Sequence, residues 1–111
     1  MERRRAPRIA LALSVEIWPS FSPKSLRPIF FTTKNISVMG FYFETGSRGG
    51  FEEGGEYNFS IIFPPDLTGN VCEYVSGVGT FARVAEVGEN LFGFGMQIKE
   101  SASGYRIDGD G

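Results

Sequence analysis

Apolar side chains recur at every second position in several short segments of this chain, and turn-forming residues separate these segments. Along residues 9–17, small or polar residues alternate with the apolar Ile9, Leu11, Leu13, Val15 and Ile17. Because successive side chains of a strand point to opposite faces, this period of two predicts a strand with one buried face. The pattern favours an all-β fold with little or no helix.

Aromatic and β-branched residues form further segments of this kind, at residues 29–33, 41–45, 57–63, 71–87 and 91–98. The first two flank a turn at Gly40, which predicts a hairpin. Gly77 and Gly79 predict a bulge or bend within the long segment that contains them. At 111 residues the chain can bury one modest core, so we expect a single domain. Six antiparallel strands predict a barrel that avoids exposed edges by closing on itself.

The segments between and beyond the expected strands are rich in Gly, Pro and Ser. Residues 18–28 predict a loop, and the glycines of residues 46–55 favour a mobile surface loop. Residues 99–111 are polar and Gly-rich, which predicts a frayed tail. The expected organisation is a flexible arginine loop at residues 1–8, a barrel at residues 9–98 and this tail.

Positive charge is concentrated at the start of the chain. Four arginines, partly offset by Glu2, give the first eight residues a net charge of about +3, although the whole chain carries −2. This asymmetry indicates a local anion site, or a simple anionic tether, rather than a track for a polyanion. An oligonucleotide-binding barrel would need basic residues along its sheet face, so we expect no binding of DNA or RNA.

The residue types present exclude several kinds of chemistry. The chain has no histidine and a single cysteine, Cys72, which excludes histidine-based catalytic triads, imidazole metal sites and an intramolecular disulfide. Lone carboxylates give no acid–base set, so we expect that the protein is not an enzyme. The apolar run after Arg5 is short and is interrupted by Glu16, which argues against a secretory signal and against membrane insertion. We therefore expect a cytoplasmic protein.

Two short motifs contain the residues best suited to binding. They comprise Arg4 and Arg8 before the first strand, and Asn35, Ser37 and Gly40 around the hairpin turn. An arginine fork can donate paired hydrogen bonds to phosphate or to guanine O6 and N7, and it can stack on a base. Asn and Ser at a turn can bond to the backbone or to a ligand, and Gly40 permits a backbone conformation closed to other residues.

These motifs, RxxxR ahead of the first strand and NxSxxG between two strands, resemble those of the PilZ domain family. The resemblance covers nearly the whole chain. It implies a six-stranded antiparallel PilZ-type β-barrel that binds the second messenger cyclic di-GMP, with ligand contacts from Arg4, Arg8, Asn35, Ser37 and Gly40. An arginine in the place of Arg3 is associated in this family with a stacked ligand dimer, so we expect Arg3 to bind ligand and two nucleotides to bind each domain.

The composition of the arginine loop also predicts how binding is signalled. A short charged segment buries too little apolar surface to offset its ordering entropy, so we expect the loop to be disordered without ligand. Binding would fold the loop over the barrel and signal to a downstream protein effector. The alternative is a PilZ-like scaffold that binds no nucleotide and acts through protein contacts around Trp18 and Phe21. Arg83 is interpreted as a salt-bridge partner on the barrel surface.

Overall fold

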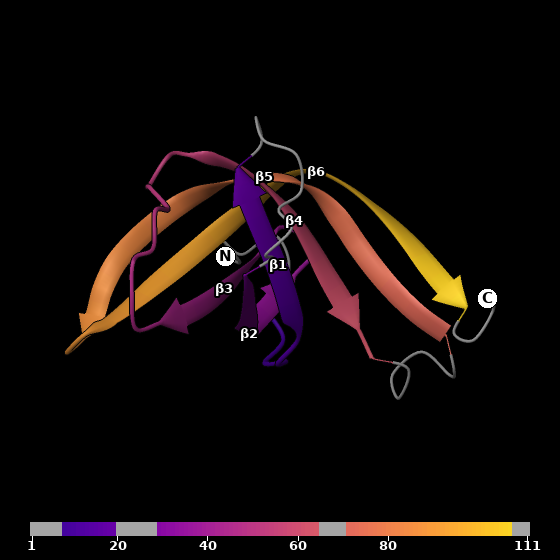
Figure 1. Cartoon of the computed structure of the whole chain (residues 1–111), viewed down its shortest axis with the longest axis horizontal. Helices are drawn as coiled ribbons and strands as arrows, with labels where there is room; N and C mark the ends of the chain where they lie inside the picture. Colours follow the sequence, from indigo (N-terminus) through magenta and orange to yellow (C-terminus); the bar gives the residue numbers. More distant parts are fainter. Residues whose placement is uncertain (1–7, 20–28, 65–70, 108–111) are drawn as a thin grey trace, which may run out of the picture.

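The computed structural model describes residues 8–19, 29–64 and 71–107, without the side chains of residues 71–73 and 103–107. Its strands are β1 (Ser14–Pro19), β2 (Phe30–Ser37), β3 (Gly40–Thr45), β4 (Glu56–Phe63), β5 (Val71–Gly88) and β6 (Leu91–Ile107). All neighbours are antiparallel, and the strands close into a barrel in the order β1-β2-β3-β6-β5-β4 (Figure 1). The predicted six-stranded antiparallel barrel is therefore confirmed. None of the described segments forms an apolar helix of membrane-spanning length.

Phenylalanine rings fill the inside of the barrel. The fully buried ones are Phe41, Phe43, Phe59, Phe81 and Phe94. Phe43 lies near the middle of this cluster, stacked on Phe94 with ring centroids 5.1 Å apart and edge-to-face with Phe81 at 6.1 Å. Offset-stacked and edge-to-face rings attract each other in addition to burying apolar area. Inward-facing aromatic residues on several strands thus hold the barrel closed.

Thr33 attaches the segment that precedes β1 to β2. Its hydroxyl accepts a hydrogen bond from the backbone N–H of Leu13 at 2.9 Å and donates one to the carbonyl oxygen of Leu11 at 2.7 Å. The Thr33 side chain thus takes the place of backbone partners, and the regular strand begins only at Ser14. The strand predicted at residues 9–17 is therefore wrong in its first half. The segment nevertheless follows β2, because Ile9 pairs with Ile36 near the hairpin turn.

β6 continues along β5 beyond its pairing with β3, and near the C-terminus in Figure 1 the yellow end of β6 lies beside the start of β5. β6 pairs with β3 through Gln97, but it pairs with β5 as far as Ile107. The frayed tail predicted at residues 99–111 is therefore wrong for residues 99–107, and residues 108–111 lie outside the described residues. Backbone hydrogen bonds to β5 hold this polar stretch, because the ladder does not depend on apolar side chains.

Two further features of the barrel bear on the predictions from sequence. A register shift between Val78 and Gly79 confirms the bulge expected near Gly77 and Gly79. The segment 46–55 is attached to the core by Phe51, whose ring packs against the ring of Phe81 with the two ring centroids 5.4 Å apart. Its backbone is also bonded to the barrel, since the N–H of Gly54 donates to the carbonyl oxygen of Phe81 at 2.8 Å. A connection expected to be a mobile surface loop is thus anchored by one aromatic side chain.

Candidate functional site

The first strand-like contact of the chain places Arg8 beside the hairpin turn. Ile9 and Ile36 exchange two backbone hydrogen bonds, of 2.9 and 3.0 Å, in an isolated antiparallel bridge. Arg8 directly precedes this bridge, and its Nη1 donates a hydrogen bond of 2.6 Å to the Oδ1 of Asn35. Arg8 is exposed, and the rest of its guanidinium fork keeps N–H donors that this bond does not use. The two sequence motifs thus meet in the described part of the chain.

The turn between β2 and β3 is shaped by Ser37 and Gly40. The hydroxyl of Ser37 accepts a hydrogen bond of 3.0 Å from the N–H of Met39, which closes the turn. A Cβ on Gly40 would overlap the backbone carbonyl oxygen of Met96 on β6. Gly40 is not in a left-handed conformation, unlike Gly49 and Gly54. The expected backbone reason for glycine at position 40 is therefore wrong, and the close approach of β6 is the reason.

A pocket of about 550 Å³ opens on the outer surface where the two motifs meet. Its lining includes Arg8, Asn35, Gly40, Tyr42, Arg83 and Gly95. Ser37 lines a different hollow, an apolar groove of about 570 Å³ that it shares with Ile9 and Val38. The pocket therefore brings together three of the predicted site residues, and Ser37 contributes through the turn. Arg3 and Arg4 lie outside the described residues.

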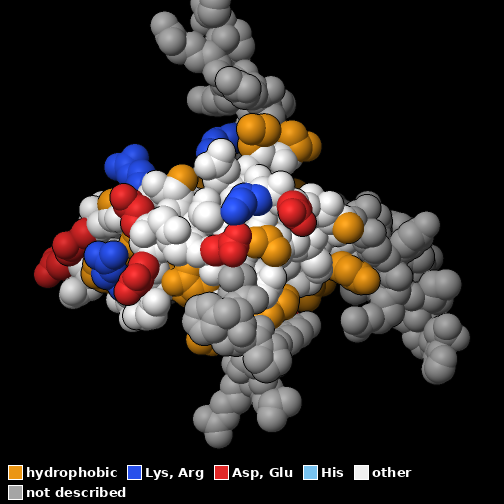
Figure 2. Space-filling view, turned by 90° about the horizontal axis from the view of Figure 1, so that it is seen from above, with side chains coloured by type: hydrophobic (Ala, Val, Ile, Leu, Met, Phe, Trp, Pro, Cys, Tyr) orange, Lys and Arg blue, Asp and Glu red, His pale blue; other side chains and the backbone are white. Residues whose placement is uncertain are grey.

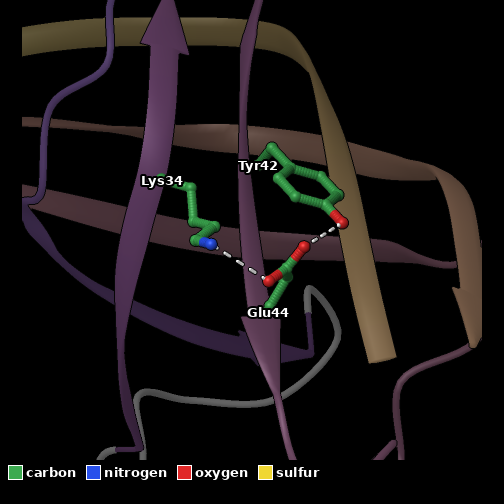
Figure 3. Close-up of polar contacts among 3 residues, drawn as sticks. All are labelled: Lys34, Tyr42 and Glu44. Carbon is green, nitrogen blue, oxygen red and sulfur yellow. Dashed lines mark hydrogen bonds and ion pairs between the residues drawn. The ribbon is translucent and has the colours of Figure 1, made fainter. Parts of the chain in front are cut away.

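Tyr42 is held at the pocket by a polar chain on the outer face of β2 and β3 (Figure 3). Its hydroxyl donates a hydrogen bond of 2.9 Å to Oε2 of Glu44, and Lys34 Nζ lies 3.2 Å from Oε1 of the same carboxylate. The hydrogen bond from Tyr42, together with Lys34, lowers the pKa of Glu44. Burial and the bond to Glu44 raise the pKa of Tyr42, and the nearby positive charge of Arg83 opposes that rise.

Four residues in register form a row across the outer surface of the barrel. Gly95 on β6 pairs with Tyr42 on β3 and with Arg83 on β5, and Tyr42 also pairs with Asn35 on β2. Paired residues of neighbouring antiparallel strands share one face of the sheet. The row therefore runs from Asn35 to Arg83, and the missing side chain of Gly95 leaves a gap in its middle.

Sequence reasoning missed Tyr42 and Arg83 as members of the site. Arg83 is exposed, and among the described residues it forms no ion pair, so the predicted salt bridge is not found there. A signal for this surface was present in the last strand, where Gly93 and Gly95 alternate with Phe92, Phe94 and Met96. Two glycines on the outward face of a strand indicate that neighbouring side chains, or a ligand, lie across it.

Charge on the barrel surface is mixed. On the face shown in Figure 2, Lys and Arg side chains lie apart from one another among Asp and Glu side chains. Single-stranded nucleic acids bind along continuous basic grooves, which this face lacks. Within the described ranges, no three His, Cys, Asp or Glu side chains are placed to hold a metal ion.

Comparison with known proteins finds solved structures with the same fold. The barrel is similar to an inhibitor of motility. That protein is MotI/DgrA of Bacillus subtilis, matched with a TM-score of 0.74 and 18% sequence identity. The match covers 92% of this chain and 45% of that one, so this chain spans less than half of its length. No model of a protein family and no curated protein matches the sequence, and the likeness therefore shows the fold alone.

Proposed function

We propose that this chain is a PilZ-type receptor domain that binds cyclic di-GMP in the pocket between Arg8 and the β2–β3 turn. The observation that carries the proposal is the 2.6 Å hydrogen bond between Arg8 and Asn35. It joins the two motifs that resemble those of the PilZ family, although they are 27 residues apart in the sequence. The similarity of the barrel to the inhibitor of motility supports the fold that the proposal requires.

The chemistry of the pocket suits a guanine dinucleotide. The free donors of Arg8 can bind a phosphate or the O6 and N7 edge of guanine, and charge-assisted hydrogen bonds of this kind are the stronger ones. Asn35 supplies both an amide donor and an acceptor once Arg8 turns toward the ligand. Gly40 lines the pocket and allows the backbone of β6 to approach closely. Arg3 and Arg4 would add further guanidinium contacts from the segment before Arg8, and Ser37 would keep the turn in shape.

Signalling in this proposal depends on the segment before Arg8. Ligand binding orders the arginine loop over the barrel, and a downstream protein effector responds to the ordered loop. Cyclic di-GMP is a bacterial second messenger, so the domain would act in the cytoplasm. Backbone amide relaxation at residues 2–8, with and without nucleotide, tests this step. Equal rigidity in the two states would contradict it.

Titration calorimetry tests the binding directly. The wild-type chain should bind cyclic di-GMP more tightly than cyclic di-AMP or GTP, and binding should weaken as salt rises. Arg8→Ala should lower the affinity by roughly 10- to 100-fold, because a hydrogen bond to a charged group contributes about 1.5–3 kcal/mol. Arg48→Ala is the matched control, since Arg48 is exposed and does not line the pocket.

The same titration decides between the remaining interpretations. Equal and weak binding of all three nucleotides would indicate a simple anionic tether. Absence of binding would favour the protein-contact scaffold, for which the apolar groove beside Ile9 and Val38 offers exposed apolar surface. A stoichiometry of two nucleotides per chain, reduced to one by Arg3→Ala, would support the role proposed for Arg3.

A further inference from the structure

The surface between Tyr42 and Arg83 has the features of a base-binding platform. Tyr42 is held in place through its hydroxyl, which donates to Glu44, while Glu44 is paired with Lys34 (Figure 3). A Cβ on Gly93 would overlap the Tyr42 hydroxyl, so the phenol lies directly over β6 at a position that only glycine allows. The ring is therefore fixed across the surface of the sheet and does not extend into solvent.

Arg83 lies on the other side of the gap that the missing side chain of Gly95 leaves in the row. A Cβ built on Gly95 would lie 3.9 Å from the Cβ of Arg83, so the stem of the arginine borders the space that Gly95 leaves open. Gly95 is in register with both Tyr42 and Arg83, and these two residues are therefore separated by two strand spacings, about 10 Å. An aromatic ring and a guanidinium that flank a glycine floor can receive a flat, electron-rich ring by stacking and by hydrogen bonding.

We infer that Tyr42 and Arg83 form a second part of the binding site, in which one base of the ligand stacks on Tyr42 while Arg83 binds its edge or the adjoining phosphate. This inference rests on the proposed function. It extends the site from the Arg8–Asn35 pair across β3 and β6 to β5, along the row of residues in register. It also names the aromatic side chain that contacts the base. The fully buried phenylalanines are not candidates for this contact, because they lie inside the barrel.

Variants of Tyr42 separate stacking from a structural role. Tyr42→Ala should lower the affinity for cyclic di-GMP by roughly 5- to 100-fold, the range found when stacking aromatic side chains are truncated. Tyr42→Phe loses the bond to Glu44 but keeps the ring, so it should bind within about threefold of wild type. Tyr74→Ala is the matched control, because Tyr74 is a half-buried tyrosine of β5 that does not line the pocket.

Variants of Arg83 test the guanidinium. Arg83→Ala should lower the affinity by roughly 10- to 100-fold, and Arg83→Lys should recover only part of the loss, since lysine lacks the planar fork. Arg48→Ala should bind as wild type does. Each variant is first checked for an unchanged melting temperature, so that an effect on folding is not read as an effect on binding.

Calorimetry with cyclic di-GMP on this set of variants, combined with NMR of the wild-type chain, decides the inference. In the wild-type spectrum, the ring protons of Tyr42 should move upfield when a base stacks on them. If the wild-type chain binds but Tyr42→Ala and Arg83→Ala bind equally well, this inference is overturned and the proposed function stands. If Tyr42→Ala or Arg83→Ala does not fold, an unmoved Tyr42 ring signal in the bound wild-type chain overturns it instead. If the wild-type chain binds no cyclic di-GMP, both proposals are overturned.

Discussion

Gly40 has no space for a side chain, because the backbone of β6 lies against its α-carbon. We predict that Gly40→Ala destabilises the fold by about 1–3 kcal/mol, the cost typical of overpacking at a site that cannot relax. The contact is with the carbonyl oxygen of Met96, and a backbone atom in a strand yields less easily than the end of a side chain. Urea unfolding of the variant measures this cost.

Gly50→Ala supplies the control for that experiment. Gly50 is exposed, has no heavy atom within 4 Å of the place of a Cβ, and does not have a left-handed backbone. The change there should alter stability by less than about 0.5 kcal/mol, as is usual for surface substitutions. Equal stability of the two variants would contradict the account of Gly40.

Glu44 connects Lys34 and Tyr42, and its pKa is lowered by both partners. A carboxyl with a lowered pKa in the folded state stabilises the fold above its ordinary value of 4.5, and the contribution is lost as pH falls through the lowered value. Wild type should therefore be more stable than Glu44→Gln near neutral pH, and this difference should shrink in acid. Urea midpoints at about pH 6 and about pH 3, at constant ionic strength, measure it.

A matched acidic residue tests the specificity of that pH effect. Glu89 lies on the exposed turn between β5 and β6. Glu89→Gln removes a carboxyl outside the Lys34–Glu44–Tyr42 chain and is measured in the same way as the control. If the difference between Glu44→Gln and wild type stays constant, the polar chain in Figure 3 does not stabilise the fold in solution.

Among the elements, the segment ahead of β1 depends most on a single side chain. Thr33→Val keeps the shape of Thr33 but removes the hydroxyl, which leaves the N–H of Leu13 and the carbonyl of Leu11 without that partner. We predict a loss of about 1–3 kcal/mol, the cost of unsatisfied buried polar groups. Because the segment carries Arg8 to Asn35, the variant should also bind cyclic di-GMP more weakly. Urea unfolding and calorimetry measure the two effects.

Thr32→Val is the control for that prediction, since Thr32 is exposed on the same strand. It should leave both stability and binding nearly unchanged. A Thr33→Val variant that unfolds at the same urea concentration as Thr32→Val would contradict the role of the Thr33 hydroxyl.

The elements that sequence predicts well are those whose side chains alternate clearly. β4 is an example, because Tyr57, Phe59 and Ile61 are all buried as the period of two requires. The prediction of a strand at residues 9–17 was wrong in its first half, because hydrogen bonds of the Thr33 side chain replace the backbone ladder there. The prediction of a frayed tail was wrong for residues 99–107, because these residues pair with β5 although their composition favours a tail. Both errors come from partners that are distant in the sequence.

At the scale of the whole molecule, the phenylalanine core should dominate stability. Phe43→Ala should cost about 3–5 kcal/mol, since it removes a fully buried ring that contacts several others. Phe30→Ala is the control, because Phe30 is 52% exposed on β2 and should cost far less. Thermal or urea unfolding of the two variants makes the comparison. Similar losses at both positions would contradict the assignment of the core.

Part of the candidate site was also predictable from the sequence. Asn35 and Gly40 belong to a motif near a turn, and Arg8 belongs to a motif near a strand, so their local patterns point to them. Gly93 and Gly95 indicate that side chains lie across the last strand, but only the register of β3, β6 and β5 identifies Tyr42 and Arg83 as residues that line the pocket. That register depends on how the whole barrel closes, which no local pattern contains.

The central claim is that the start of the chain and the β2–β3 turn bind one ligand together. Mapping of amide chemical shifts during titration of the labelled chain with cyclic di-GMP tests it most directly. The account predicts that the signals of Arg8, Asn35, Gly40 and Gly95 move together with one saturation curve, while the segment 46–55 stays unchanged. Unchanged signals at these four positions when the ligand is in large excess, or changes confined to residues 46–55, would contradict it.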